Sequence, residues 1–458
     1  MNKKLQRGIV VILITNVINM LFSFATNFLL PKYLSVESYA GIKEFQLYVS
    51  YVGLFHFGFV DGIYLRYGGK NIDKQVDEKF STNLSTMRIF QILITVISIV
   101  VSIILKDTIL LIFSLSILPQ NMSNYYKFLY QATGEFDLYG KAMNITTIST
   151  FILNMVLLFV FKIDNLYIYC IGYLFVFIGI WLILEIGFKK KHTFEKGSVF
   201  SFTALVENIK SGFLLTLGNL SSMFLTTMDR WFVKFLMNTL TFAQYSFAVS
   251  IENFLNLAIT PVTTTLYNYF CRENNMDQLR KIYNYVIIFS TLIPAAAFPV
   301  KFIVNSYINK YADANRIIFL LFASQIFYIV IKGIYVNLYK VQRRQNIYFI
   351  KLITVLCIGF IFNCLFYLWL KTKEAFAIGT LLSSIVWFFI SKRDFEYIYN
   401  DRKTEIYLFV ELFSFIFLGF NFNPFLGLIT YLVITIIFSW IFMNKTMKEL
   451  YFMLKKVF

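Results

Sequence analysis

The segment GIVVILITNVINMLFSFATNFLL, residues 8–30, carries no charged side chain. A helix needs about 20 mainly apolar residues to cross the hydrocarbon core of a bilayer. The run is too long for the apolar core of a signal peptide, and no A-x-A-like cleavage site follows it. It therefore predicts an uncleaved transmembrane helix near the start of the chain.

The whole composition agrees with this first segment. Of the 458 residues, 58% are hydrophobic and 15% are charged, against about 45–50% and about 25% in soluble domains. The 54 Phe and 30 Tyr also exclude a disordered chain. Continuous apolar runs favour helices over the short alternating strands of a membrane barrel. We expect an all-α polytopic membrane protein with about fourteen transmembrane helices, at residues 8–30, 39–63, 84–105, 109–130, 143–161, 166–188, 211–236, 240–270, 282–303, 317–339, 352–370, 375–390, 406–420 and 425–443.

The net charge of +17 is explained by where the cations lie. Most of the 42 Lys and Arg fall in alternate loops, such as the basic stretch at 189–191. Cytoplasmic loops collect Lys and Arg, so this bias places both termini in the cytoplasm. The charge then records membrane orientation, and we expect no nucleic-acid partner.

An internal repeat appears when the sequence is shifted by about 203 residues. The shift aligns Met20 with Met223 and Ala40 with Ala243. An even number of helices per unit predicts a parallel repeat with a substrate path between two bundles. We expect an N-terminal six-helix bundle over residues 1–188, a basic cytoplasmic linker over 189–210, a C-terminal six-helix bundle over 211–392, and an additional helix pair with a basic cytoplasmic tail over 393–458.

A polar stripe recurs in register with the repeat. The four positions of the first stripe share one helix face, and the shift carries them to a second set on one face. The sets are Asn16, Asn19, Ser23 and Asn27, then Asn219, Ser222, Thr226 and Arg230. Lys234 lies one turn beyond Arg230, and two cations so spaced can bind an anionic group. The alternative is a structural ion pair that holds this helix in place.

Other ionisable residues within the runs are expensive in hydrocarbon and need a partner or a hydrated cavity. Arg88 and Lys127 are further candidates for substrate binding, although no stripe fixes their direction. Side chains at helix ends can reach the headgroups, which is our interpretation of Lys43, Lys301 and Glu185.

Three carboxylates and one proline are candidates for coupling or gating. Asp61 lies near the cytoplasmic end of the predicted span at 39–63, where it is expected to pair with Arg66 or to have a structural role. Asp229 is rotated about 100° from Arg230, so it tethers that side chain or faces a neighbouring helix. Glu252 lies on the next helix, where Pro261 is expected to introduce a kink.

Catalytic, metal and cofactor chemistry is not indicated. The four Cys are scattered and the two His cannot make a metal site alone. No predicted loop is long enough for a soluble catalytic domain. We expect no catalytic residue, no metal and no cofactor, and a transporter rather than an enzyme.

Several segments resemble a known family. MDRWFVKFLMNTLTFAQYSFA (228–248) is similar to the seventh-to-eighth helix signature of Wzx-type polysaccharide flippases of the MOP/MATE-like superfamily, with Asp229, Arg230 and Tyr245 at its Asp-Arg and aromatic positions. LPKYLSVESYAGI (30–42), FGFVDGIYLRYGG (57–69) and QATGEFDLYGK (131–141) resemble the family's external turn, second-helix end and loop after the fourth helix.

The resemblance implies a flippase for undecaprenyl-pyrophosphate-linked oligosaccharide in the bacterial cytoplasmic membrane, serving O-antigen, capsule or exopolysaccharide synthesis. It implies a cationic cavity that receives the pyrophosphate and sugars, to which Arg230 would belong. It also admits other polysaccharide-assembly membrane proteins as partners. Two alternatives stay open: a cation-coupled multidrug exporter of the same superfamily, and a membrane glycosyltransferase or polymerase.

Overall fold

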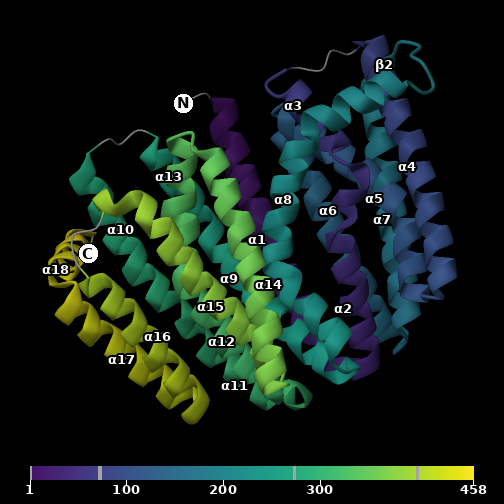
Figure 1. Ribbon diagram of the computed structural model, residues 1–458. Helices are drawn as coiled ribbons and strands as arrows, with labels where there is room; N and C mark the ends of the chain where they lie inside the picture. The colour runs from purple at the N-terminus through teal and green to yellow at the C-terminus, as the bar shows by residue number, and fades with distance from the viewer. Residues whose placement is uncertain (1–2, 71–74, 272–274, 399–401, 458) are drawn as a thin grey trace. The chain divides into compact units, whose positions relative to one another are not determined.

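The computed structural model describes residues 3–70, 75–271, 275–398 and 402–457. The chain divides into two compact units, Met1–Ser222 and Met223–Phe458, and the boundary falls inside helix α8. The elements of the first unit, with α8, are α1 Lys3–Tyr33, α2 Val36–Ser50, η1 Val52–His56, α3 Phe59–Tyr67, β1 Gln75–Val76, α4 Glu78–Leu105, α5 Thr108–Ala132, α6 Phe136–Met155, η2 Val156–Val160, α7 Leu166–Lys191, β2 Thr193–Phe194 and α8 Phe202–Leu236 (Figure 1).

The second unit is helical throughout its described residues. Its elements are α9 Thr239–Phe270, α10 Met276–Leu292, η3 Ile293–Ala296, α11 Ala297–Tyr307, η4 Asn309–Ala314, α12 Asn315–Val330, η5 Ile331–Tyr335, α13 Val336–Val341, α14 Gln345–Leu370, α15 Glu374–Lys392, η6 Arg393–Ile398, α16 Lys403–Asn421, α17 Pro424–Phe442 and α18 Asn444–Val457. Among the described residues, strands occur only in the first unit, where two residues of β1 pair in parallel with two of β2.

Ten helical segments of the described chain are long and apolar enough to cross a membrane. They are Ile14–Tyr33, Glu78–Leu105, Phe136–Val160, Leu166–Lys191, Met276–Tyr307, Asn309–Val341, Gln345–Leu370, Glu374–Ile398, Lys403–Asn421 and Pro424–Phe442. The remaining predicted runs also fall on helices: 109–130 on α5, 211–236 on α8, 240–270 on α9 and 39–63 on α2 to α3. The protein is therefore a multi-pass helical membrane protein, and the count of fourteen spans stays a prediction.

The predicted helix at 39–63 is wrong as a single element. α2 ends at Ser50, a 3₁₀ turn follows, and α3 begins at Phe59. Phe57 and Gly58 have φ values of 50° and 95°, in the left-handed region that ends a helix. The Gly58 amide donates to Nδ1 of buried His56 at 3.1 Å, which satisfies one backbone group that the break exposes.

The first helical hairpin of each unit keeps the 203-residue register. α1 ends at Tyr33 and α2 begins at Val36, whereas α8 ends at Leu236 and α9 begins at Thr239. The capping residues correspond too. The Ser35 side chain accepts from the Ser38 amide, and the Asn238 side chain accepts from the Thr241 amide. The register is lost further on, because α9 continues to Phe270 without the break that ends α2.

The first unit is held together where α3 crosses the start of α8. A Cβ on Gly212 would overlap the Gly58 carbonyl oxygen and the Gly62 nitrogen, so the two backbones are in direct contact. Beside this contact the Thr216 hydroxyl donates to the carboxylate of buried Asp61. The pairing expected between Asp61 and Arg66 is wrong, because Arg66 forms its ion pair with Glu207 of α8, at 3.1 Å.

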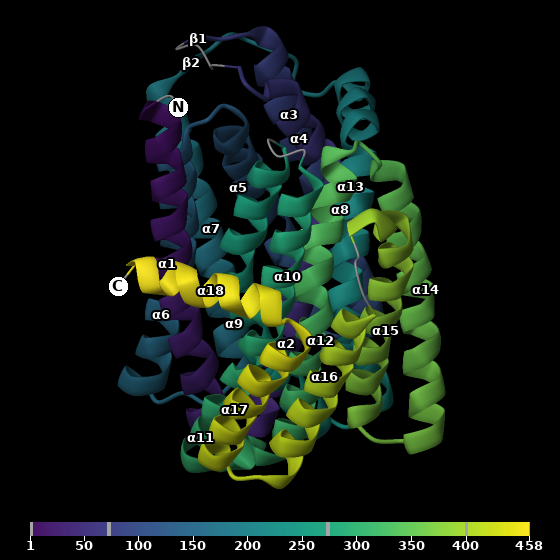
Figure 2. The ribbon, with the colours of Figure 1, turned by 90° about the vertical axis from the view of Figure 1, so that its left-hand side faces the viewer.

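The second unit is built around α12, whose residues Ile317 to Val330 are all buried. α9, α10, α15 and α16 pack against α12, and α16 and α17 lie side by side as a helix pair (Figures 1 and 2). Hydroxyl groups bind this pair to α10. The Tyr407 hydroxyl is hydrogen-bonded to the hydroxyls of Thr291 at 2.8 Å and Ser439 at 2.9 Å. The Tyr431 hydroxyl donates to the Thr291 carbonyl at 2.6 Å.

The α3–α8 contact predicts opposite effects for two glycines of one helix. Gly212→Ala should destabilise the protein by about 1–3 kcal/mol, the usual range for overpacking, because neither backbone can move aside. Gly218→Ala is the matched control, since a Cβ there meets nothing within 4 Å and alanine favours a helix. Thermal unfolding of the purified variants measures both effects. An unchanged melting temperature for Gly212→Ala would contradict the contact.

Candidate functional site

The carboxylate of Asp229 joins three helices of the second unit. Asp229 lies on α8 and is 5% exposed. Its Oδ2 accepts a hydrogen bond from the hydroxyl of Tyr245 on α9 at 2.7 Å, and the Thr380 hydroxyl of α15 lies 3.5 Å away. Its Oδ1 accepts from the Arg230 amide at 2.7 Å. Of the two orientations expected for Asp229, the structure therefore has the one that faces a neighbouring helix.

Arg230, the next residue of α8, is rotated about 100° from Asp229 and lies at the end of the predicted stripe. Asn219, Ser222 and Thr226 are exposed, and Arg230 is half-buried. Its Nε is buried and has no hydrogen-bond partner among the described residues. A guanidinium with an unsatisfied donor attracts an anion, because a donor left without a partner costs about 1–3 kcal/mol.

Lys234 follows Arg230 by one turn and is also half-buried. Its Nζ lies 5.4 Å from the Trp231 ring centre and 5.5 Å from that of Phe235. These rings hold the ammonium group close to its own helix. The geometry keeps two cations on the last two turns of α8, and their role as anion ligands stays a prediction.

A second polar group is centred on Glu252 of α9. The Gln325 side chain of α12 donates to Glu252 Oε1 at 2.5 Å. One turn further along α9, Asn256 accepts from Lys332 at 3.2 Å. Lys332 lies in the π-helical turn η5, which interrupts the α-helical path between α12 and α13, and such turns are frequent at functional sites.

Tyr245 connects the two carboxylates. Its hydroxyl donates to Asp229, and it lies about two turns before Glu252 on α9. The structure thus brings together Asp229, Arg230 and Glu252 of the predicted set. Pro261 also belongs to α9, but its side chain lies outside the described residues, so the kink expected there stays untested.

In the first unit the corresponding hairpin carries a buried cation. Lys43 of α2 is 6% exposed, and its Nζ donates to Asn27 of α1 at 2.8 Å and to Gln46 at 3.1 Å. The interpretation of Lys43 as a side chain that reaches the headgroups is therefore wrong. Asn27 is the first-unit equivalent of Arg230. Its side-chain oxygen accepts a hydrogen bond from the Lys43 ammonium group and so stabilises that charge in a buried position.

Three of the other charges in the predicted spans have partners within their own units, namely Arg88, Glu185 and Lys301. Arg88 binds Glu185 at 2.8 Å, and Glu185 also binds Lys189 at 2.7 Å. Glu185 is thus a buried ion-pair partner and not an interfacial carboxylate. Lys301 donates to the carbonyls of Gly419 and Phe422 at the end of α16, at 2.7 and 2.8 Å. Lys127 lies half-buried on α5.

Three residues of the site escape reasoning from sequence. Thr380 and Gln325 are single polar side chains in apolar runs, which carry no signal of their own. Lys332 is visible as a charge within a predicted span, but its partner Asn256 is distant in the sequence. Tyr245 is the exception, because the resemblance singles it out.

The whole chain can be compared with known proteins. No family model and no curated protein matches the sequence. Among solved structures, the lipid II flippase MurJ in an inward closed conformation superposes with a TM-score of 0.72 and 15% identity, covering 96% of this chain and 99% of MurJ. An outward-facing multidrug-resistance transporter of the MATE family, in the MOP superfamily, gives a TM-score of 0.50 with 14% identity, covering 87% of this chain and 99% of its own.

The first of these structures is named as a lipid flippase and the second as a multidrug-resistance transporter. At 14–15% identity the likeness concerns the fold, and it extends over nearly the full length of each protein. The chain therefore shares its fold with these two solved structures.

Proposed function

We propose that this protein is a flippase that moves undecaprenyl-pyrophosphate-linked oligosaccharide across the bacterial cytoplasmic membrane by alternating access. The observation that carries the proposal is the full-length likeness to a lipid II flippase. A flippase for a lipid-linked headgroup must carry a large polar and anionic group through hydrocarbon. Cations held in the membrane-spanning helices meet that need.

The position of the cations supports an anionic substrate. Arg230 and Lys234 lie on adjacent turns of α8, and Arg230 has a donor without a partner among the described residues. A guanidinium can bind two oxygens of a pyrophosphate, and the ammonium adds a point charge. Arg88 is engaged with Glu185, so Arg230 is the better ligand.

The likeness to a MATE transporter keeps a multidrug exporter as the second candidate. Cationic drugs favour acidic, aromatic binding surfaces. The described carboxylates Asp229 and Glu252 are both engaged by hydrogen bonds, whereas the less buried charge of α8 is cationic. An anionic substrate therefore fits these residues better.

We assign coupling to the group formed by Asp229 and Glu252. Their hydrogen bonds link α8, α9, α12 and α15, so a change in protonation or cation binding alters contacts among four helices. Energetic coupling requires that the ion interact differently with two states of the transporter. A carboxylate shared by helices that repack meets that requirement.

The substrate assignment predicts the behaviour of a deletion strain. Cells that lack the gene should accumulate lipid-linked oligosaccharide in the inner leaflet, and the gene should restore export. Leaflet-specific labelling of the glycolipid measures this. Drug sensitivity without glycolipid accumulation would favour the exporter instead.

Arg230 provides a test at the level of one side chain. Arg230→Ala should reduce export at least about tenfold, since loss of a charged hydrogen bond costs about 1.5–3 kcal/mol, and Arg230→Lys should retain part of it. Arg343→Ala is the control, because Arg343 is exposed in the turn after α13. Export by Arg230→Ala at the wild-type rate, with equal membrane abundance, would remove Arg230 from the site.

Asp229 tests the coupling assignment separately. Asp229→Asn keeps the shape of the side chain but cannot carry charge, so transport should lose its dependence on the ion or proton gradient. Tyr245→Phe removes only the 2.7 Å hydrogen bond and should keep that dependence. Transport in vesicles with imposed gradients measures both. Gradient-dependent transport by Asp229→Asn would assign coupling elsewhere.

A further inference from the structure

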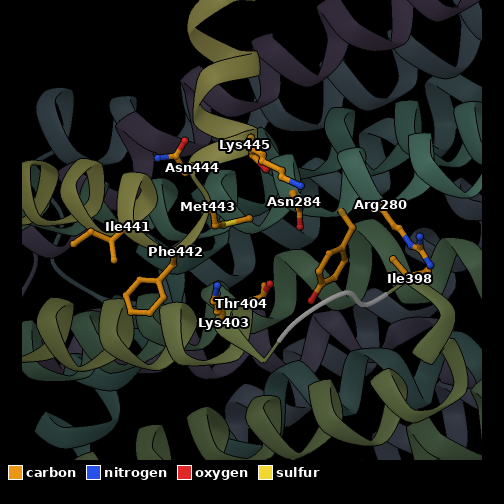
Figure 3. A pocket seen from close by; sticks show the side chains of 12 residues that line it. Arg280, Asn284, Ile398, Lys403, Thr404, Ile441, Phe442, Met443, Asn444 and Lys445 are labelled. Carbon is orange, nitrogen blue, oxygen red and sulfur yellow. The ribbon is translucent and has the colours of Figure 1, made fainter.

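A cavity of roughly 410 Å³ lies at one end of the second unit, and none of the candidate site residues described above lines it. It is bounded by the start of α10, the end of η6, the start of α16, the end of α17 and the start of α18 (Figure 3). These are the ends that the distribution of Lys and Arg assigns to the cytoplasmic surface.

Three cations from three different elements line the cavity. They are Arg280 of α10, Lys403 of α16 and Lys445 of α18, and Figure 3 shows them around one hollow. The Arg280 guanidinium is oriented by the Tyr397 carbonyl, to which it donates at 3.0 Å, and it lies 3.7 Å from Asp277. Among the described lining residues none is acidic, so the cavity carries an excess of positive charge.

Neutral donors complete the polar half of the lining. The side chains of Asn284, Thr404, Asn444 and Thr446 all contribute to it. A phosphate group presents oxygens that accept from cations and from neutral amide and hydroxyl groups together. The mixture of cations and neutral donors, with no described carboxylate, fits a phosphate better than a metal ion or a cationic ligand.

The other half of the lining is apolar and continues onto the outside of α17. Ile441 and Phe442 line the cavity. Ile441 is 62% exposed, and Ile437, one turn earlier on the same face, is 49% exposed. A ligand with its phosphate among the cations therefore finds an apolar path beside it, along a helix surface long enough to face lipid.

Helix α18 follows the end of α17 that the distribution of Lys and Arg assigns to the cytoplasmic surface. It runs across the direction of α17 (Figure 2), and Tyr451 and Phe452 on it are exposed. Glu449 anchors it to α10, because it accepts from Tyr285 at 2.9 Å and pairs with Lys281 at 3.3 Å. A basic helix with exposed aromatic residues is typical of a segment that rests on a membrane surface.

We propose that this cavity binds the phosphate of an anionic phospholipid of the cytoplasmic leaflet, with an acyl chain along Ile437 and Ile441. Basic pockets between transmembrane helices on the cytoplasmic side suit such headgroups. The site is separate from the one proposed for transport, and it would make the last helix pair and α18 a place where membrane composition affects the protein.

The test uses the purified full-length protein and native mass spectrometry with phosphatidylglycerol or phosphatidylcholine as the probe. The wild type should retain phosphatidylglycerol in preference to phosphatidylcholine. The double variant Lys403→Gln/Lys445→Gln should bind phosphatidylglycerol at least about tenfold more weakly, since each cation near the surface contributes about 1 kcal/mol. The control Lys310→Gln/Lys371→Gln removes the same charge at the opposite helix ends and should bind as the wild type does.

Several outcomes would overturn the proposal. Equal retention of both lipids by the wild type, or unchanged binding by the Lys403/Lys445 variant, would exclude a headgroup site in this cavity. Displacement of phosphatidylglycerol by millimolar inorganic phosphate would identify a site for a soluble anion instead. Thermal unfolding without lipid verifies folding. If the double variant is unfolded, the single variant Lys445→Gln replaces it, and unchanged binding by that variant counts against the site.

Discussion

The hydrogen bonds to Asp229 are the interaction on which the second unit depends. A carboxylate within a membrane-spanning bundle is stable only if the protein supplies its donors. Those donors come from Tyr245 and the chain's own amide, with Thr380 nearby. Because the donors belong to different helices, the packing of α8, α9 and α15 and the ionic state of one side chain cannot change independently.

The same constraint explains the difference between the two units. Asn27 and Arg230 occupy matching positions of the repeat. Asn27 accepts a hydrogen bond from buried Lys43, whereas Asp229, the residue before Arg230, accepts one from Tyr245. The buried cation of the first hairpin thus lies on its second helix, whereas Arg230 and Lys234 of the other hairpin lie on its first helix. The two units share a helical hairpin, but they stabilise a buried charge with different partners: Asn27 accepts from Lys43 in one, and Tyr245 donates to Asp229 in the other.

The two units also differ in their second helix, which is broken between α2 and α3 in the first unit and continuous as α9 in the other. The first unit has Gly53 and Gly58 in the segment between α2 and α3, where the repeat places Asn256 and Pro261 in continuous α9. The glycines permit the left-handed backbone at Gly58. They also allow α3 to approach α8 at Gly62 and Gly212, a contact that a straight helix would not make with the same residues.

Much of the fold follows from the sequence, because apolar runs long enough to cross a bilayer have few alternatives to a helix. The hairpin ends at Tyr33 and Leu236 even keep the register that the repeat predicts. The choice of partners does not follow. Arg66 pairs with Glu207 and not with Asp61, and Lys43 turns inward to Asn27. Such partners are set by which helices meet in space, and a sequence periodicity of one helix contains no record of its neighbour.

The candidate site shows the same limit. Arg230, Asp229 and Glu252 are identifiable because charges are rare in apolar helices. Thr380, Gln325 and Lys332 complete the group only after α9, α12 and α15 have packed. Neutral polar residues are common in membrane helices as ordinary packing residues, so they do not mark a site by themselves.

The hydroxyl network of Tyr407, Tyr431, Thr291 and Ser439 has an evolutionary consequence. It buries polar groups of α10 beneath α16 and α17, and Glu411 lies fully buried on the same pair with Thr435 as donor. Without α16 and α17 the Thr291 hydroxyl would keep its hydrogen bond to the Ile288 carbonyl of its own helix, at 2.9 Å, but the Thr291 carbonyl would lose the hydrogen bond from Tyr431. Addition or loss of the last pair would therefore change the hydrogen bonding of α10 as well as the length of the chain.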